Sequence, residues 1–164
     1  MARIVTGVFE NRRSAEDAVQ RLLDAAFSQR DISVLMSDST QGREFGVQDS
    51  SKAPEGAVAG ATAGGILGAV AAGLVAVGVL AVPGLGLVAA GPILAALAGA
   101  GAGGAAGGLI GGLVGAGIPE HEAKMYSEEL ANGGILVGIY VHDDTAKIAE
   151  SILETSGAKS VANR

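Results

Sequence analysis

Hydrophobic and polar positions divide the chain into two patterned regions that flank one long apolar segment. In the first region, Ile4 to Phe9 is a short run rich in β-branched and aromatic residues, which predicts a strand. Ser14 is expected to start a helix, with Asp17 three residues later in an approximate capping box. Asp31 to Met36 is the second predicted strand. Helical spacing predicts the inner face of the helix as Ala15, Ala18, Val19, Leu22, Leu23 and Ala26.

The second patterned region follows the apolar segment. Pro119 is well placed as the first residue of a helix that ends at Asn132-Gly133 and carries Ala123, Tyr126 and Leu130 on one face. Ile135 to Val141 is the third predicted strand, and Ala158 to Ala162 is the last one. Between them, Asp143 or Asp144 is expected to cap a helix that stops at Gly157. Its predicted inner residues are Ile148, Ala149, Ile152 and Leu153.

Without the apolar segment, the order is strand, helix, strand, extra helix, strand, helix, strand. Right-handed crossovers on one side of a small sheet favour an α+β fold, a ferredoxin-like split βαβ domain. The apolar segment is then an inserted glycine-zipper α-helical hairpin. The predicted organisation is residues 1–36 for the first half of the domain, 37–55 for a polar linker, 56–118 for the hairpin and 119–164 for the second half.

The apolar segment carries no Asp, Glu, Lys or Arg from residue 56 to residue 119. This length is about three times the ~20 residues that cross a bilayer core as a helix, so it can supply two spans. Pro83-Gly84 and Gly91-Pro92 bracket the expected turn. Residues four apart share a helix face, and glycine there lets two helices pack closely. The expected helix-packing residues are Gly56, Gly60, Gly64, Gly68, Gly99, Gly103, Gly107, Gly111 and Gly115.

We expect a protein that self-associates through this hairpin, at the first of two locations, with the second as the alternative. The first is the inner, cytoplasmic membrane, with lipid as a partner and both termini cytoplasmic, because two spans return the chain to its starting side. Arg43, Lys52 and Lys124 flank the hairpin, although no Trp or Tyr belt marks its boundaries. The second is a soluble homo-oligomeric shell in which several copies bury the hairpins, around a lipid or another apolar guest. A third interpretation is a regulatory module whose open sheet face binds a small ligand.

The chain offers little chemistry. A net charge of −6 with few aromatic residues argues against nucleic acid as a partner. Gly99–Gly104 formally matches a dinucleotide fingerprint, but no strand leads into it. The clusters Glu120–Glu122 and His142–Asp144 each place a histidine beside carboxylates, yet helix-start acids and caps explain both. We therefore expect no catalytic residue, cofactor or metal, and a protein that is not an enzyme.

The pattern as a whole resembles a group of bacterial general stress proteins, and its opening block looks like their heat-induced stress domain. The resemblance implies a stress-induced, often membrane-associated protein, and we therefore expect the self-associating protein to act in the stress response. The resemblance supplies no established reaction and no catalytic residues. It spans nearly the full chain. The residues that carry it are Gly7–Leu22, Asp31–Met36, the Gly/Ala-rich segment with Ala90–Leu94, Gly117–His121 and Gly133–Val137.

Overall fold

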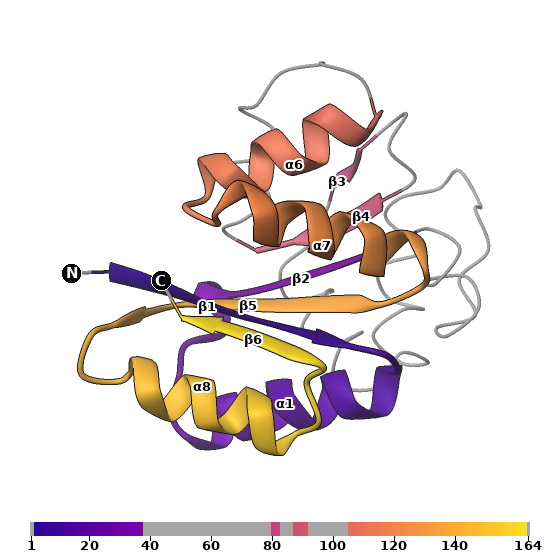
Figure 1. Cartoon of the computed structure of the whole chain (residues 1–164). Coiled ribbons are helices and arrows are strands. Elements are labelled where there is room, and N and C mark those ends of the chain that lie inside the picture. Colours follow the sequence, from indigo (N-terminus) through magenta and orange to yellow (C-terminus); the bar gives the residue numbers. More distant parts are fainter. Residues whose placement is uncertain (1, 38–79, 83–86, 92–104, 164) are drawn as a thin grey trace.

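The structure, a computed structural model, describes residues 2–37, 80–82, 87–91 and 105–163. These residues form an α+β fold in which one antiparallel sheet has helices on both faces (Figure 1). The strands are β1 (Ala2–Phe9), β2 (Ile32–Ser37), β3 (Leu80–Val82), β4 (Leu87–Ala90), β5 (Ile135–His142) and β6 (Ser160–Asn163). The helices are α1 (Arg12–Asp24), α6 (Ala105–Gly115), α7 (Glu120–Ala131) and α8 (Ala146–Thr155), with a 3-10 turn, η1, at Gln29–Asp31.

The strand order is β3-β4-β2-β5-β1-β6. Strand β5 therefore lies between β1 and β2, and its register places Ile139 opposite both Val5 and Ile32. Helix α1 connects β1 to β2, and helix α8 connects β5 to β6. Each of these helices crosses over one intervening strand, because β5 separates the first pair and β1 separates the second.

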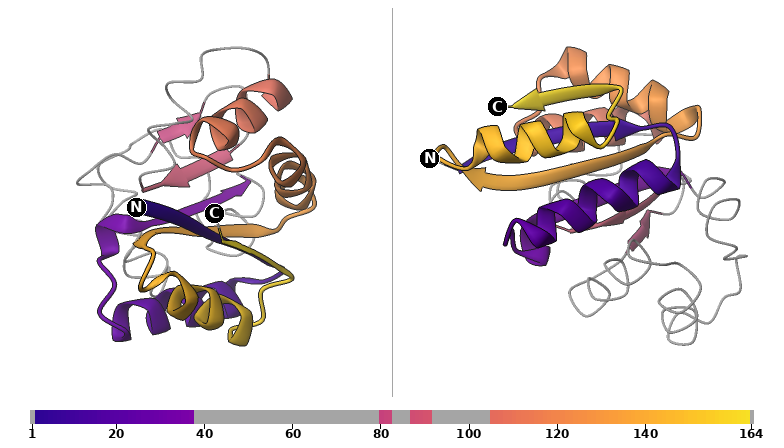
Figure 2. Two further views of the ribbon diagram at one scale, coloured as in Figure 1. Left: turned by 60° about the vertical axis from the view of Figure 1, so that its left-hand side comes forward. Right: turned by 90° about the horizontal axis from the view of Figure 1, so that it is seen from below.

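Helices α1 and α8 cover one face of the sheet and lie side by side there (Figure 2). Helices α6 and α7 cover the other face (Figure 1). The alternation along β1 follows from the pleat: Val5 and Phe9 are buried towards α1 and α8, whereas Ile4 and Val8 are buried towards α6 and α7. The sheet thus separates two hydrophobic cores.

The predicted inner face of α1 is largely confirmed, since Ala15, Ala18, Val19 and Leu22 are fully buried and Leu23 is half-buried. The predicted start is wrong. The N-cap is Asn11, whose side-chain oxygen accepts a hydrogen bond from the Ser14 N–H at 2.9 Å. Asn is as good an N-cap residue as Ser, and with this cap the helix begins at Arg12, before the predicted Ser14. Ala26, expected on the inner face, lies beyond the end of the helix and is exposed.

The helices of the second half pack mostly as predicted, but each begins after the expected residue, since Pro119 is the N-cap of α7 rather than its first residue. Helix α7 follows Pro119 and buries Ala123, Tyr126 and Leu130. Helix α8 begins after Thr145, so neither Asp143 nor Asp144 is its N-cap residue. Its residues Ala149 and Leu153 are buried and Ile152 is half-buried, as expected. Ile148 is 51% exposed, so its predicted inward orientation is wrong.

Each of the four α-helices that the structure describes ends in the same C-terminal motif. The residue after the C-cap has a positive φ and donates its N–H to the carbonyl three residues back, and the next residue donates to the carbonyl five residues back. This is the hydrogen-bond pattern of the Schellman motif, which satisfies the last carbonyl groups of a helix. The positive-φ residues are Ala26, Gly117, Gly133 and Gly157.

Strands β3 and β4 lie where the sequence predicted the end of one membrane span and the turn to the next. They pair with each other, and β4 also pairs with β2, so the sheet continues beyond β2. Gly91 ends β4 with a φ of 97°, and a Cβ added there would lie 2.3 Å from the Ile32 carbonyl oxygen. The prediction of helix or interhelical turn at residues 80–82 and 87–90 is wrong, because the open edge of β2 provides hydrogen-bond partners there. The predicted linker beyond Ser37 lies outside the described residues.

Candidate functional site

Helix α6 has a composition that disfavours a helix in water. Five of its eleven residues are glycine, and each glycine costs about 1 kcal/mol relative to alanine in a helix. Its inner side compensates for this cost, because Leu109 and Leu113 are buried in one cluster with Tyr126 and Leu130 of α7. At the end of α6, the Tyr140 hydroxyl of β5 donates a hydrogen bond to the Ala116 carbonyl at 3.2 Å. The helix is therefore held by its leucine side.

The opposite side of α6 is uncovered by any described residue. We call this side, formed by Gly111, Val114 and Gly115, the α6 glycine face. A Cβ added at Gly111 or Gly115 would have no described atom within 4 Å, and Val114 is 43% exposed. No charged residue occurs in α6. The face is thus exposed, uncharged and nearly free of side chains, which are the properties that allow a second helix to approach closely.

The structure describes only part of the predicted glycine stripes. Gly107, Gly111 and Gly115 lie in α6 at four-residue spacing, whereas Gly56, Gly60, Gly64, Gly68, Gly99 and Gly103 lie outside the described residues. Gly112, the residue after Gly111, is buried, so these adjacent glycines of α6 face opposite ways. Val114 was not predicted for this face, although residues three apart on a helix are neighbours and Val114 follows Gly111 at that spacing.

The two histidine clusters of the sequence both lie within the described residues. Among the described residues, no group of three or more His, Cys, Asp or Glu side chains is placed to hold a metal ion. His121 Nε2 lies 3.7 Å from a carboxylate oxygen of Glu122, and Glu122 itself is only 5% exposed. The dinucleotide-like stretch Gly99–Gly104 lies outside the described residues.

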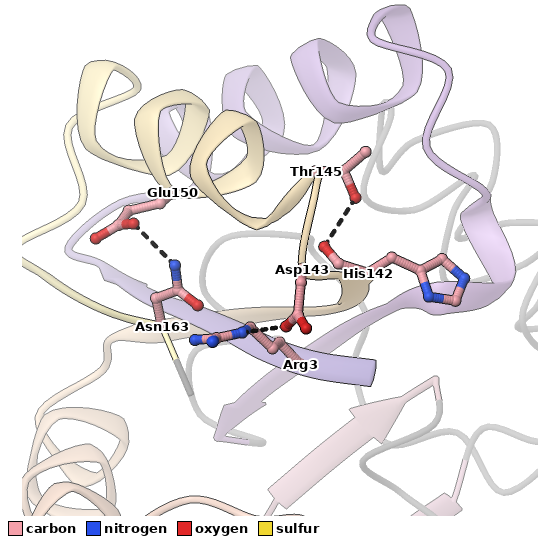
Figure 3. A network of polar contacts seen from close by, with 6 residues as sticks. All are labelled: Arg3, His142, Asp143, Thr145, Glu150 and Asn163. Carbon is pink, nitrogen blue, oxygen red and sulfur yellow. Dashed lines mark hydrogen bonds and ion pairs between the residues drawn. The ribbon is translucent and has the colours of Figure 1, made fainter. Parts of the chain in front are cut away.

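The second cluster belongs to a polar network at the ends of β1, β5 and β6 (Figure 3). Asp143 accepts a hydrogen bond from Arg3 Nε, and this bond is the main reason that the pKa of Asp143 lies below its usual range. His142 points away from this pair, and its carbonyl accepts a hydrogen bond from the Thr145 hydroxyl at 3.2 Å (Figure 3). Asn163 donates to Glu150 at 2.9 Å. These contacts join strand ends to α8 and make the network structural.

A membrane span was expected at the glycine-rich helices. Of the helices that the structure describes, none is both long enough and apolar enough to cross a bilayer.

Comparison with known proteins gives a match to a family model. Residues 4–80 match the family model described as the heat induced stress protein YflT domain. This part of the chain is similar to the YflT domain. The match agrees with the resemblance of the opening block to the heat-induced stress domain of bacterial general stress proteins. No curated protein and no solved structure matches the chain.

The YflT match covers β1, α1 and β2 and ends at the first residue of β3. Strands β1 and β2 are not neighbours in the sheet, because β5 lies between them. In the sheet, the strands of the matched range are therefore bridged by a strand from outside that range. Helix α6, with its glycine face, also lies outside that range.

Proposed function

We propose that this protein is a non-enzymatic stress-response protein that acts by self-association, and that the α6 glycine face is its contact surface. The observation that carries the proposal is the two-sided character of α6. Its leucine side is docked on α7, whereas Gly111 and Gly115 on the other side meet no described atom. Glycine destabilises a helix that is exposed to water. Close packing of the glycine face against another helix would offset this cost and explain the composition of α6.

The partner in this proposal is the α6 glycine face of a second copy. Homo-oligomers most often have two-fold symmetry, in which the same patch meets itself. Gly111 and Gly115 present backbone rather than side chains, so two copies of α6 can cross at short distance, with weak Cα–H···O contacts between them. The absence of charge from α6 means that no like charges oppose each other across the axis.

The fold of the domain under this surface supports the ferredoxin-like interpretation. The order β2-β5-β1-β6 and the crossover helices α1 and α8 on one face are those of a split βαβ arrangement. In such a domain the opposite face is open for other elements, and here α6 and α7 occupy it. The chain between β2 and α7 thereby brings the glycine face to the outside of the domain.

Disulfide cross-linking tests the proposal directly, because the chain contains no cysteine. A Gly111→Cys variant places a single thiol at the centre of the face. We expect rapid formation of a covalent dimer under mild oxidation, since a two-fold axis near Gly111 brings the two thiols together. Ser151→Cys, at an exposed position of α8, is the matched control. Equal cross-linking of the two variants would refute the assigned contact surface.

We propose that this self-association takes place at or in the inner, cytoplasmic membrane, and a soluble assembly is the alternative. Flotation of the untagged protein with lipid vesicles after a carbonate wash separates the two cases. Protein that floats is integral to the membrane, and the cross-link then forms within the bilayer. Protein that remains dense and elutes as an oligomer buries its apolar helices in a soluble assembly.

A further inference from the structure

The C-terminal end of α7 carries an Asn-Gly pair, in which Asn132 is exposed and Gly133 is half-buried. Asn132 is the C-cap residue, with φ −81° and ψ 2°, and Gly133 follows with a φ of 96°. The Gly133 N–H donates to the Leu130 carbonyl at 3.1 Å, and the Gly134 N–H donates to the Glu129 carbonyl at 2.8 Å. The pair is therefore locked into a Schellman motif.

Asn-Gly pairs can lose ammonia without an enzyme. The Gly133 backbone nitrogen attacks the side-chain carbonyl carbon of Asn132, the new C–N bond closes a cyclic imide, and the side-chain amide nitrogen leaves as ammonia with the backbone proton. Water then opens the imide to an aspartate or an isoaspartate. Water is the only co-reactant, and glycine favours the reaction because it has no side chain to hinder the attack.

The folded end of α7 opposes this reaction in two ways. The attacking N–H is engaged in a hydrogen bond with the Leu130 carbonyl. The helical backbone of Asn132, with ψ near zero, also directs the Gly133 nitrogen away from the side-chain carbon that it must reach. Both constraints are lost when the last turn of the helix opens, and helix ends open at lower free energy than the core.

We infer that Asn132 is a site of spontaneous deamidation whose rate is set by the opening of the α7 C-terminus. The reaction is irreversible because ammonia is lost. The fraction of molecules deamidated at Asn132 therefore increases with the time that this helix end has spent open, for example during heating. This inference does not rest on the proposed self-association.

Deamidation of Asn132 also destabilises the C-terminal end of α7, whose opening sets the rate of the reaction. A new carboxylate at the C-cap faces the negative end of the helix dipole and follows Glu128 and Glu129 in the sequence. The Glu129 carboxylate is paired with Lys159 at 2.9 Å, and this ion pair links the end of α7 to the segment before β6. Converted molecules are therefore expected to open more readily at this end.

The test follows deamidation in the intact full-length chain by peptide mass spectrometry, in mildly alkaline buffer with and without urea. We expect Asn132 to convert at least about ten-fold more slowly in the native protein, equivalent to ~1.4 kcal/mol of opening free energy. Asn11 and Asn163, which both precede arginine, serve as slow internal controls. Equal native and urea rates, or no conversion in urea, would overturn the inference.

Two variants test whether opening of the α7 C-terminus sets the rate of deamidation. Gly134→Ala places a Cβ 2.8 Å from the Glu129 carbonyl oxygen and should open the helix end, so Asn132 should convert faster in native buffer. Gly7→Ala is the control, because its Cβ would meet Ala158 at 3.2 Å, on the α8 side of the sheet. Faster conversion in Gly7→Ala than in Gly134→Ala would show that opening of α7 does not set the rate.

Discussion

The hydroxyl groups of Thr6 and Tyr126 lie 2.9 Å apart in a buried hydrogen bond between the central sheet and α7. Thr6 is on the face of β1 that α7 covers, between Ile4 and Val8, which belong to the same hydrophobic cluster as Tyr126. The bond thus fixes the position of α7, and α7 in turn supports the leucine side of α6.

Removal of one partner of this bond should be costly. We expect Tyr126→Phe to lower the free energy of unfolding by about 1–3 kcal/mol, because it withdraws the buried hydroxyl that pairs with Thr6. Urea denaturation of Tyr126→Phe, Thr6→Val and the double variant measures the coupling, which should appear as a double variant less destabilised than the sum of the singles. Strict additivity would show that the two hydroxyls contribute independently.

Gly91 provides a test of the β3–β4 extension of the sheet. We expect Gly91→Ala to destabilise the protein by about 2 kcal/mol more than Gly117→Ala, because its Cβ would clash with the Ile32 carbonyl. Gly117 is a matched control, since its φ of 98° equals that of Gly91 within a degree and its Cβ would meet no described atom within 4 Å. Similar unfolding free energies for the two variants would argue against the pairing of β4 with β2.

Ala26 is the one alanine among the four positive-φ residues that end the described helices, with a φ of 64°. Alanine in this conformation destabilises the folded state by about 1–2 kcal/mol. Replacing it by glycine removes this strain, but the greater conformational entropy of glycine in the unfolded chain offsets part of the gain. Ala26→Gly should therefore stabilise the protein by about 0.5–1 kcal/mol in thermal or chemical denaturation. Ala25→Gly, at a negative φ, should destabilise it. A destabilising Ala26→Gly would be inconsistent with the motif at the end of α1.

The Arg3–Asp143 pair predicts an acid-dependent contribution to stability. The pKa of Asp143 is lowered in the folded state, chiefly by its hydrogen bond with Arg3. The contribution is therefore present above the ordinary carboxyl pKa of 3.8 and is lost as the pH falls through the folded value. NMR titration should show the Asp143 midpoint below 3.8 and a higher midpoint in Arg3→Gln. An unchanged midpoint in that variant would exclude Arg3 as the cause.

The regular elements of the domain were predictable because their hydrophobic periodicity is strong. The spacing of Ala15, Ala18, Val19 and Leu22 matches one helix face, and all four residues are buried. Short elements were not predictable in the same way. Leu80–Val82 and Leu87–Ala90 contain only leucine, valine and alanine, which suit an apolar helix as well as a strand, so the partner strand β2 decides the outcome.

The candidate site was predictable in part. Four-residue glycine spacing predicted a packing face on the helix that contains Gly107, Gly111 and Gly115, and the structure places that helix at residues 105–115. Which side of the helix is docked could not be predicted, because glycine occurs on both sides of α6. The burial of Leu109 and Leu113 against α7 decides it, and this contact depends on tertiary packing.

The most direct test of the proposed function is the mass of the full chain in detergent-free solution, measured by sedimentation equilibrium beside Gly111→Leu and Ser151→Leu. A Cβ at position 111 meets no described atom within 4 Å, whereas a leucine side chain there blocks close approach of a second α6. The account predicts an oligomer for the natural sequence and for Ser151→Leu, and a monomer of 16.0 kDa for Gly111→Leu. An oligomer of unchanged mass in Gly111→Leu, or a monomeric natural sequence, would contradict self-association through the α6 glycine face.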